Sequence, residues 1–381
     1  MMKKTLAAVA VLSAFVGSAF AGEVTIYGRV GTGLLLQDQE GTNFAGDKVV
    51  DQTKWGMDSG VTTTNRIGFK GSEQISDDLE VGFVLETKLI TDTGSAFNGG
   101  FERESLIYAK TNYGSFYAGR VGSMWSDGGS TNFWASNYVA GGTGGGGYSV
   151  QGIGLMVNEM AREANRISYV SPTFAGFTLY GEYSFGNKTD VQENTSRNER
   201  PAALGLKYAN GNFGSGLIVT YRNEASVGTY ATNGSDPEDE VTVNLGVNYN
   251  AGFANFKLAG QYFTGANSIG NVTGTLDDID ASISGYDDLK GYSFVAGADI
   301  PAWGGSWTVS VAYTDAEDDA VANGDEFTGF NIGAMYTYPL SKQTLIKAGA
   351  GYLKTEAERT GATHKAEFES IDAWVGIVQY F

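Results

Sequence analysis

Residues 241–250, VTVNLGVNYN, alternate strictly between two kinds of side chain. The odd-numbered positions, from Val241 to Tyr249, are apolar, and the even-numbered positions, from Thr242 to Asn248, are polar or glycine. Because successive side chains of a β-strand point to opposite faces, the segment predicts a strand with one apolar and one polar face.

The same alternation recurs along the chain, for example in SWTVSVAYT (306–314) and LEVGFVLETKL (79–89), and gives about 16 candidate strands. Tight turns rich in Gly, Asn, Pro and Ser connect every second pair. Longer segments connect the other pairs, among them residues 37–62, 123–164, 266–289 and 317–326. Short and long connections in alternation indicate successive antiparallel hairpins, with all tight turns at one end.

A soluble β-sandwich also alternates apolar and polar residues, but three features favour a membrane barrel. The strands reach about ten residues or more, which matches a tilted span of the bilayer. Aromatic residues such as Tyr338, Tyr352 and Tyr380 gather near strand ends, where interface girdles lie. The polar faces carry charges such as Arg66 and Lys70, which a packed core does not bury freely. The expected fold is all-β, a transmembrane antiparallel β-barrel of about 16 strands.

The two chain ends fit this reading. Residues 1–21 have two lysines, a short apolar stretch and a terminal Ala-Phe-Ala, the layout of a cleaved signal peptide. Residues 22–381 would then form the barrel. The final segment AWVGIVQYF (373–381) is apolar to its last residue. Since a membrane sheet cannot leave an open edge, we expect this segment to pair with EVTIYGRV (23–30).

Composition excludes several functional classes. The formal net charge of −18 argues against a nucleic-acid partner, whose phosphates need a basic surface. The chain has no cysteine, so neither disulfides nor thiolate metal sites are available. No cofactor and no metal site are expected.

Several stretches resemble the general porins of Gram-negative outer membranes, which are trimeric 16-stranded channels. The similar stretches are VTIYGRV (24–30), TNRIGFKGSEQISDDLEVGFVLETK (64–88), RESLIYAKTNYGSFYAGR (103–120), NRISYVSPTFAGFTLYGEYSFG (165–186) and VGIVQYF (375–381). Between about 187 and 365 the resemblance rests on the strand pattern alone. The resemblance implies short periplasmic turns, long extracellular loops, a homotrimer, a third loop folded into the barrel and passive diffusion of ions and small hydrophilic solutes. It also implies that Phe381 is read by the outer-membrane assembly machinery.

Alternation and resemblance together give candidate pore residues. Apolar neighbours face outward at Ile67 and Phe69, so Arg66 and Lys70 are expected to face inward. Porins similar to this chain carry a ladder of basic residues on the barrel wall at such positions. The expected pore-lining basic wall is Arg29, Arg66, Lys70, Arg103, Arg120 and Arg166. The alternative is that these side chains are merely solvated by a wide lumen.

Residues 123–164 form the longest connection and correspond by resemblance to the inward-folded constriction loop. The loop carries few charges, so Asp127, Glu159 and Glu163 are the candidates for its acidic side. The aromatic residues Phe133, Trp134 and Tyr138 either narrow the passage or pack the loop to the wall, and we favour packing.

The segments 266–289 and 317–326 are acidic and lack basic residues. Clustered carboxylates could bind divalent cations that bridge lipopolysaccharide, but the spacing of a calcium loop is missing, so we favour solvated loops. Exposed charges act over about 10 Å at 0.1 M salt and about 3 Å at 1 M. We therefore expect weak anion preference at high salt, which shifts toward cations as the salt concentration falls.

Three other functions remain open. An outer-membrane enzyme is disfavoured, because His364 is the single histidine and no nucleophile motif lies beside it. A plugged structural or adhesin barrel would conduct no current, and a substrate-specific channel would show saturable flux. Fold alone does not separate these from a general diffusion channel.

Overall fold

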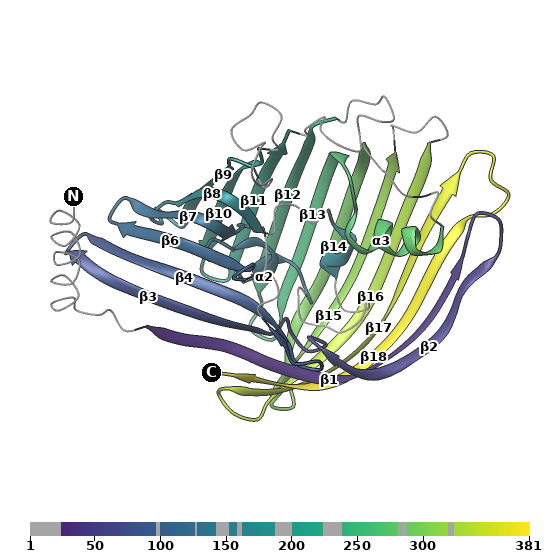
Figure 1. Cartoon of the computed structure of the whole chain (residues 1–381), viewed down its shortest axis with the longest axis horizontal. Helices are drawn as coiled ribbons and strands as arrows, with labels where there is room; N and C mark the ends of the chain where they lie inside the picture. Colours follow the sequence, from purple (N-terminus) through teal and green to yellow (C-terminus); the bar gives the residue numbers. More distant parts are fainter. Residues whose placement is uncertain are drawn as a thin grey trace, which may run out of the picture.

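The structure is a computed structural model (Figure 1), in which the expected signal peptide lies outside the described residues. The described residues are 24–96, 100–125, 128–141, 152–157, 162–186, 200–223, 238–280, 283, 288–318 and 324–381.

Antiparallel strands make up most of this part of the chain, and three short helical elements lie in the connections. The elements are β1 (Thr25–Thr42), β2 (Lys48–Ser59), β3 (Arg66–Ser76), β4 (Leu79–Ile90), β5 (Ser95–Ala96), β6 (Glu104–Thr111), β7 (Gly114–Gly122), α2 (Trp134–Tyr138), η1 (Gly152–Leu155), β8 (Arg162–Val170), β9 (Phe177–Ser184), β10 (Ala202–Asn210), β11 (Phe213–Arg222), β12 (Glu240–Asn250), β13 (Asn255–Ala266), α3 (Gly270–Ile279), β14 (Leu289–Ala302), β15 (Gly305–Asp318), β16 (Asp325–Pro339), β17 (Thr344–Arg359) and β18 (Ala366–Tyr380). None of the helices in these residues is long and apolar enough to cross a membrane.

The sheet closes on itself as a 16-stranded antiparallel barrel, which confirms the expected fold class. The closing seam joins β18 to β1, with Tyr380 opposite Arg29. Beyond it, Phe381 and Gly28 exchange two backbone hydrogen bonds of 3.1 Å. The last residue of the chain is therefore held in the sheet, as expected for a barrel without an open edge.

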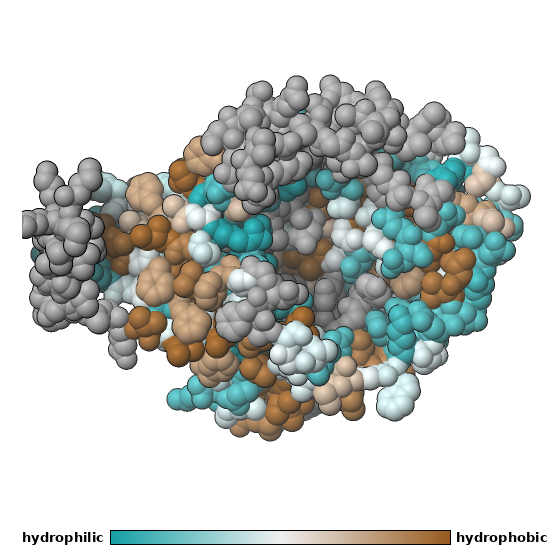
Figure 2. Space-filling view, viewed as in Figure 1, coloured by the Kyte–Doolittle hydropathy of each residue, from teal (hydrophilic) through white to brown (hydrophobic). Residues whose placement is uncertain are grey.

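The apolar face of the strands points outward. On β12, Leu245 is 56% exposed whereas its neighbour Asn244 is 1% exposed. A soluble sandwich would bury the leucine, so the orientation is that of a barrel in lipid. In Figure 2, hydrophobic residues gather over the strands at the left and bottom of the view, and hydrophilic residues cover the right-hand rim.

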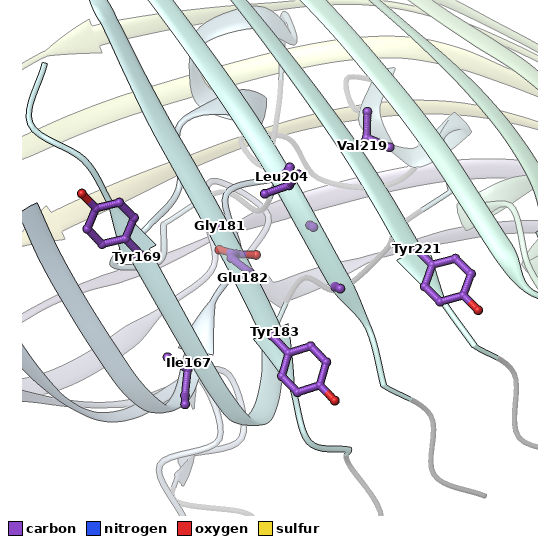
Figure 3. Close-up of a pocket in the computed structure, with 10 residues that line it drawn as sticks. Ile167, Tyr169, Gly181, Glu182, Tyr183, Leu204, Val219 and Tyr221 are labelled. Carbon is purple, nitrogen blue, oxygen red and sulfur yellow. The ribbon is translucent and has the colours of Figure 1, made fainter. Parts of the chain in front are cut away.

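Aromatic side chains mark both ends of the outer apolar band. Near the tight turns, Tyr249 lies opposite Phe213 and Phe256, and near the long loops Tyr262 lies opposite Tyr292. These rows are the interface girdles of a membrane barrel. Figure 3 shows further tyrosines, Tyr169, Tyr183 and Tyr221, which splay outward around a shallow depression at Gly181.

The first long connection differs from the expectation. Residues 37–62 were expected to form a loop, but β1 extends to Thr42 and β2 returns beside it. Both β2 and β3 run antiparallel to the same side of β1, with Ser59 opposite Thr32 and Arg66 opposite Arg29. They form one barrel strand that is interrupted by residues 60–65. The side chains of β2 are largely exposed on both faces, so the sequence there has no period-two pattern.

The connection between β13 and β14 also differs. Residues 266–289 were expected to form a solvated acidic loop, but residues 270–279 form α3, which packs inside the barrel against β16, β17 and β18 (Figure 1). Val272 and Leu276 are fully buried there. The main apolar cluster of the molecule thus lies within the barrel, between the inward-folded segments and the wall.

Candidate functional site: the barrel interior

Residues 123–125 and 128–141 lie on the inner wall, where α2 packs against β11, β12 and β13. Glycines make room for this segment. A Cβ at Gly216 or Gly246 would overlap the Tyr138 side chain, and a Cβ at Gly205 would overlap Met124. The wall therefore has a smooth inner groove at these strands, and larger residues there would push the segment into the lumen.

The aromatic residues of this segment pack against the wall. Phe133, Trp134 and Tyr138 are each at most 1% exposed, and the Phe133 ring lies 4.4 Å from the Tyr180 ring between centroids. Burial raises the pKa of the Tyr138 phenol. These side chains hold the segment in place rather than projecting into open water.

Amide side chains on the wall fix the second half of the connection. Gln261 accepts a hydrogen bond from the Val157 backbone N–H at 2.7 Å and donates one to the Val157 carbonyl at 3.0 Å. The Gln261 amide also donates to Asn244, which in turn accepts from the Trp125 indole at 3.2 Å. A side-chain amide thus replaces the backbone partner that residue 157 would have in a sheet.

Two of the expected wall arginines converge on one carboxylate. The Arg103 Nε donates to Glu86 Oε1 at 2.5 Å, and Arg66 Nη1 lies 3.4 Å from the same oxygen. The Tyr27 hydroxyl donates to the other oxygen of Glu86 at 3.1 Å. All three charged side chains are less than 10% exposed. The pairing offsets much of the field that these arginines would exert on a passing ion.

A third wall arginine is paired in the same way. Arg166 lies 3.1 Å from Glu182, and both side chains are at most 1% exposed. Glu182 also accepts hydrogen bonds from the Thr131 hydroxyl and the Met124 N–H, at 2.8 and 3.0 Å. Glu182 therefore joins the arginine to the inward-folded segment.

Glu104 anchors the start of the segment. Its carboxylate accepts hydrogen bonds from the Gly122 N–H at 3.0 Å and from the N–H and hydroxyl of Ser130 at 2.7 and 2.8 Å. Arg66 donates to the Gly128 carbonyl at 3.2 Å. The charged wall and the segment are consequently one hydrogen-bonded unit.

Three basic residues expected at the pore wall remain, namely Arg29, Arg120 and Lys70. Arg29 Nε donates to the Thr64 carbonyl at 2.9 Å, and Arg120 Nε donates to the Glu102 carbonyl at 2.5 Å. Lys70 is exposed, with its Nζ 5.2 Å from the centre of the Tyr27 ring.

Of the three acidic candidates, Asp127 and Glu159 lie outside the described residues. Glu163 is buried, with one oxygen 3.5 Å from Arg222 Nη2. No group of three or more Asp, Glu or His in the described ranges is arranged to hold a metal ion.

The interruption between β2 and β3 also enters the barrel. Val61, Thr62, Thr63 and Asn65 are each at most 2% exposed. The Thr62 carbonyl accepts a hydrogen bond of 3.1 Å from Lys347 Nζ on β17. This short segment therefore covers the inner face of the seam strands.

The sequence reading missed the carboxylates that pair with the arginines. In LYGEYS (179–184) the same alternation that places Arg166 inward also places Glu182 inward, so the signal was present. In LEVGFVLETKL (79–89), Glu86 likewise alternates with the apolar residues Leu85 and Leu89, so the same rule places it on the inner face.

A family model for Gram-negative porins matches residues 7–358 of the chain. The chain belongs to this porin family. Outer membrane porin protein 32 of Delftia acidovorans is 28% identical over 371 residues, covering 94% of this chain and 92% of the relative. A major outer membrane protein P.IB of Neisseria meningitidis is 32% identical over 220 residues, covering 56% and 57% of the two chains.

Solved structures show the same fold. The anion-selective porin from Comamonas acidovorans superposes with a TM-score of 0.62 at 23% identity, covering 94% of this porin and all of that chain. OmpT of Vibrio cholerae in its trimer form gives a TM-score of 0.59 at 16% identity, covering 95% of this porin and all of that chain. The protein is therefore an outer-membrane porin, a channel for passive diffusion of ions and small hydrophilic solutes across the bacterial outer membrane.

Proposed function

We propose that this porin is a homotrimeric general diffusion channel whose ion selectivity is weak because its wall arginines are ion-paired. The pairing of Arg66 and Arg103 with Glu86, and of Arg166 with Glu182, carries this proposal. An arginine with a carboxylate at hydrogen-bond distance attracts passing anions less than an unpaired one does.

A small positive excess remains at the wall. Arg29 and Arg120 donate to the backbone carbonyls of Thr64 and Glu102, so within the described residues their charges are not offset by a carboxylate at hydrogen-bond distance. We therefore propose slight anion preference at 1 M salt. At lower salt the charge of the whole chain, formally −18, acts over a longer distance and favours cations.

The partners follow from the same architecture. A homotrimer is supported by the trimer form of the similar OmpT of Vibrio cholerae. The outer apolar band would contact outer-membrane lipid and lipopolysaccharide. Phe381, held in the seam beside Gly28, is proposed as the residue that the assembly machinery reads. No enzymatic role is proposed, and His364 lies in the β17–β18 connection beside Gly46.

Single insertions of the purified protein into a planar bilayer test the proposal. At 1 M salt we expect open channels whose conductance rises in threes, and a salt gradient should give a reversal potential of slight anion preference. Strong cation preference at 1 M would contradict the proposed balance at the wall. Silent insertion would instead indicate a plugged structural barrel, and saturable solute flux a substrate-specific channel.

A further inference from the structure

The helix α3 lies in the barrel interior as an ordered, docked element. Ile269, directly before the helix, and Val272, Leu276 and Ile279 within it are spaced three or four apart and are each at most 4% exposed. Residues at this spacing share one face of a helix. That face packs into the same apolar cluster as Phe327 and Leu353 on the inner wall.

Specific contacts fix the position of α3. The hydroxyls of Thr275 and Thr355 on β17 are hydrogen-bonded at 2.7 Å. A Cβ at Gly329 on β16 would lie 2.8 Å from Val272, so the absence of a side chain at Gly329 allows the helix to approach the wall there. At the end of the helix, the Asp280 carboxylate accepts a 3.2 Å hydrogen bond from the Phe44 N–H in the β1–β2 turn.

The helix also contacts the inward-folded segment that carries η1. The Asn271 side chain occupies the space beside Gly154, and Gly270 lies against the Gly154 and Met156 carbonyls. Leu155 of η1 reaches the same Gly329 as Val272 does. Two connections, one before β8 and one before β14, therefore form a single apolar body against β16.

The opposite face of α3 is hydrophilic. Gly274, Asp277 and Asp278 are exposed, and nothing lies within 4 Å of a Cβ built at Gly274. Since the buried face packs against β16, β17, β18 and η1, the exposed residues lie on the side of the helix away from the wall. Any ion that passes α3 therefore meets a helix about 10 Å across with carboxylates on its surface.

We propose that α3 is a second constriction element of this porin, which narrows the channel and adds negative charge along the ion path. The inference rests on the proposed channel function. It assigns residues 270–279 a role in setting conductance and selectivity, in addition to that expected of residues 123–164.

Two substitutions on opposite faces of α3 distinguish the effect of its docked position on conductance from the effect of its charge on ion selectivity. Leu276→Asp places a carboxylate in the apolar contact and should undock the helix, which raises the unitary conductance at 1 M salt, where added charge is screened. Gly274→Asp adds the same side chain on the exposed face. It should leave the conductance at 1 M unchanged and raise the cation-to-anion permeability ratio at 0.1 M about twofold.

A crosslink tests the docked position without disturbing the barrel. The chain has no cysteine, so Thr275→Cys with Thr355→Cys introduces its only two thiols. The hydroxyls they replace are within bonding range, so oxidation should crosslink them in the inserted protein. The crosslinked channel should conduct like the wild type.

The outcomes distinguish the two proposals. Failure of the thiols to crosslink, or an L276D channel with wild-type conductance at 1 M, overturns the constriction role of α3. A G274D channel with an unchanged permeability ratio at 0.1 M overturns its charge effect. Each result is read against a conducting wild type. A silent wild type would overturn the channel function and with it the inference.

Discussion

Asn65 closes a gap in the barrel wall. It is the last residue of the interruption between β2 and β3, where β1 has no strand partner opposite Gly31 on that side of the strand. The Asn65 amide replaces that partner, since its Oδ1 accepts from the Gly31 N–H and its Nδ2 donates to the Gly31 carbonyl, both at 2.6 Å. The amide also donates to the hydroxyls of Ser59 and Thr91 at 3.1 Å.

Asn65→Ala removes both bonds to Gly31. The Gly31 carbonyl keeps the Thr91 hydroxyl at 3.0 Å, but the buried Gly31 N–H loses its partner. The bonds of the amide to Ser59 and Thr91 are lost as well, but these two hydroxyls remain hydrogen-bonded to each other at 3.1 Å. The two bonds lost at Gly31 and its unsatisfied buried donor therefore set the loss, which lowers the free energy of unfolding by about 2–4 kcal/mol. Because the position is next to the closing seam, the loss should appear in the cooperative unfolding of the barrel.

Guanidinium unfolding in detergent micelles, followed by tryptophan fluorescence, measures this loss. The matched control is Asn210→Ala, since Asn210 is exposed in a tight turn and donates a single bond of 3.0 Å to Tyr208. We expect the control to change the free energy by less than about 1 kcal/mol. If N65A unfolds at the same guanidinium concentration as N210A, the amide does not support the wall and the reasoning is refuted.

Two further predictions concern the channel interior. Gln261→Leu removes the two bonds to Val157 and should raise the population of a displaced loop roughly 30- to 150-fold, from a loss of about 2–3 kcal/mol. Single-channel records should then show added current noise. The control Gln343→Leu, in an exposed turn, should show no added noise. Equal noise in both variants would contradict the role of Gln261 in holding Val157 to the wall. Glu86→Gln leaves Arg66 and Arg103 without their shared carboxylate. At about 5 Å in water with 0.1 M salt, one uncompensated positive charge attracts an anion and repels a cation by about 0.5 kcal/mol each, a difference of about 1 kcal/mol, so the anion-to-cation permeability ratio should rise roughly fivefold. Glu80→Gln, near a tight turn, is the control, and a ratio that does not differ between these two variants would count against the wall as the selectivity determinant.

The strand pattern was readable in the sequence wherever the two faces of a strand meet different surroundings. Segments such as 241–250 have lipid on one side and the barrel interior on the other, so their side chains alternate. The residues of β2 are exposed on both faces, so no alternation is imposed and the segment was read as loop. The interruption at 60–65 depends on Asn65 reaching Gly31, a contact across 34 residues that no local pattern reports.

For the charged residues of the wall, the sequence predicted only that their side chains point inward, and not which groups they contact. Alternation placed Arg66 and Arg166 inward and would have placed Glu182 inward by the same rule. It could not show that residues 123–125 and 128–141 cover these side chains, because that depends on the glycines at 205, 216 and 246, which lie on three neighbouring strands. Burial beneath the segment turns solvated charges into ion pairs, and this changes their effect on a passing ion.

Residues 266–289 show why charge alone is a poor guide to a loop. The acidic residues of this segment indicated a solvated, self-repelling chain. Yet Ile269, Val272, Leu276, Ile279 and Ile283 recur every three or four residues between those acids, the spacing of a helix with one apolar face. Because the barrel interior offers both an apolar cluster and water, an amphipathic helix can dock there with its carboxylates exposed. The net charge of such a segment reports only on its solvent-exposed face. The spacing of the apolar residues identifies the buried face, and the charged residues lie on the face opposite to it.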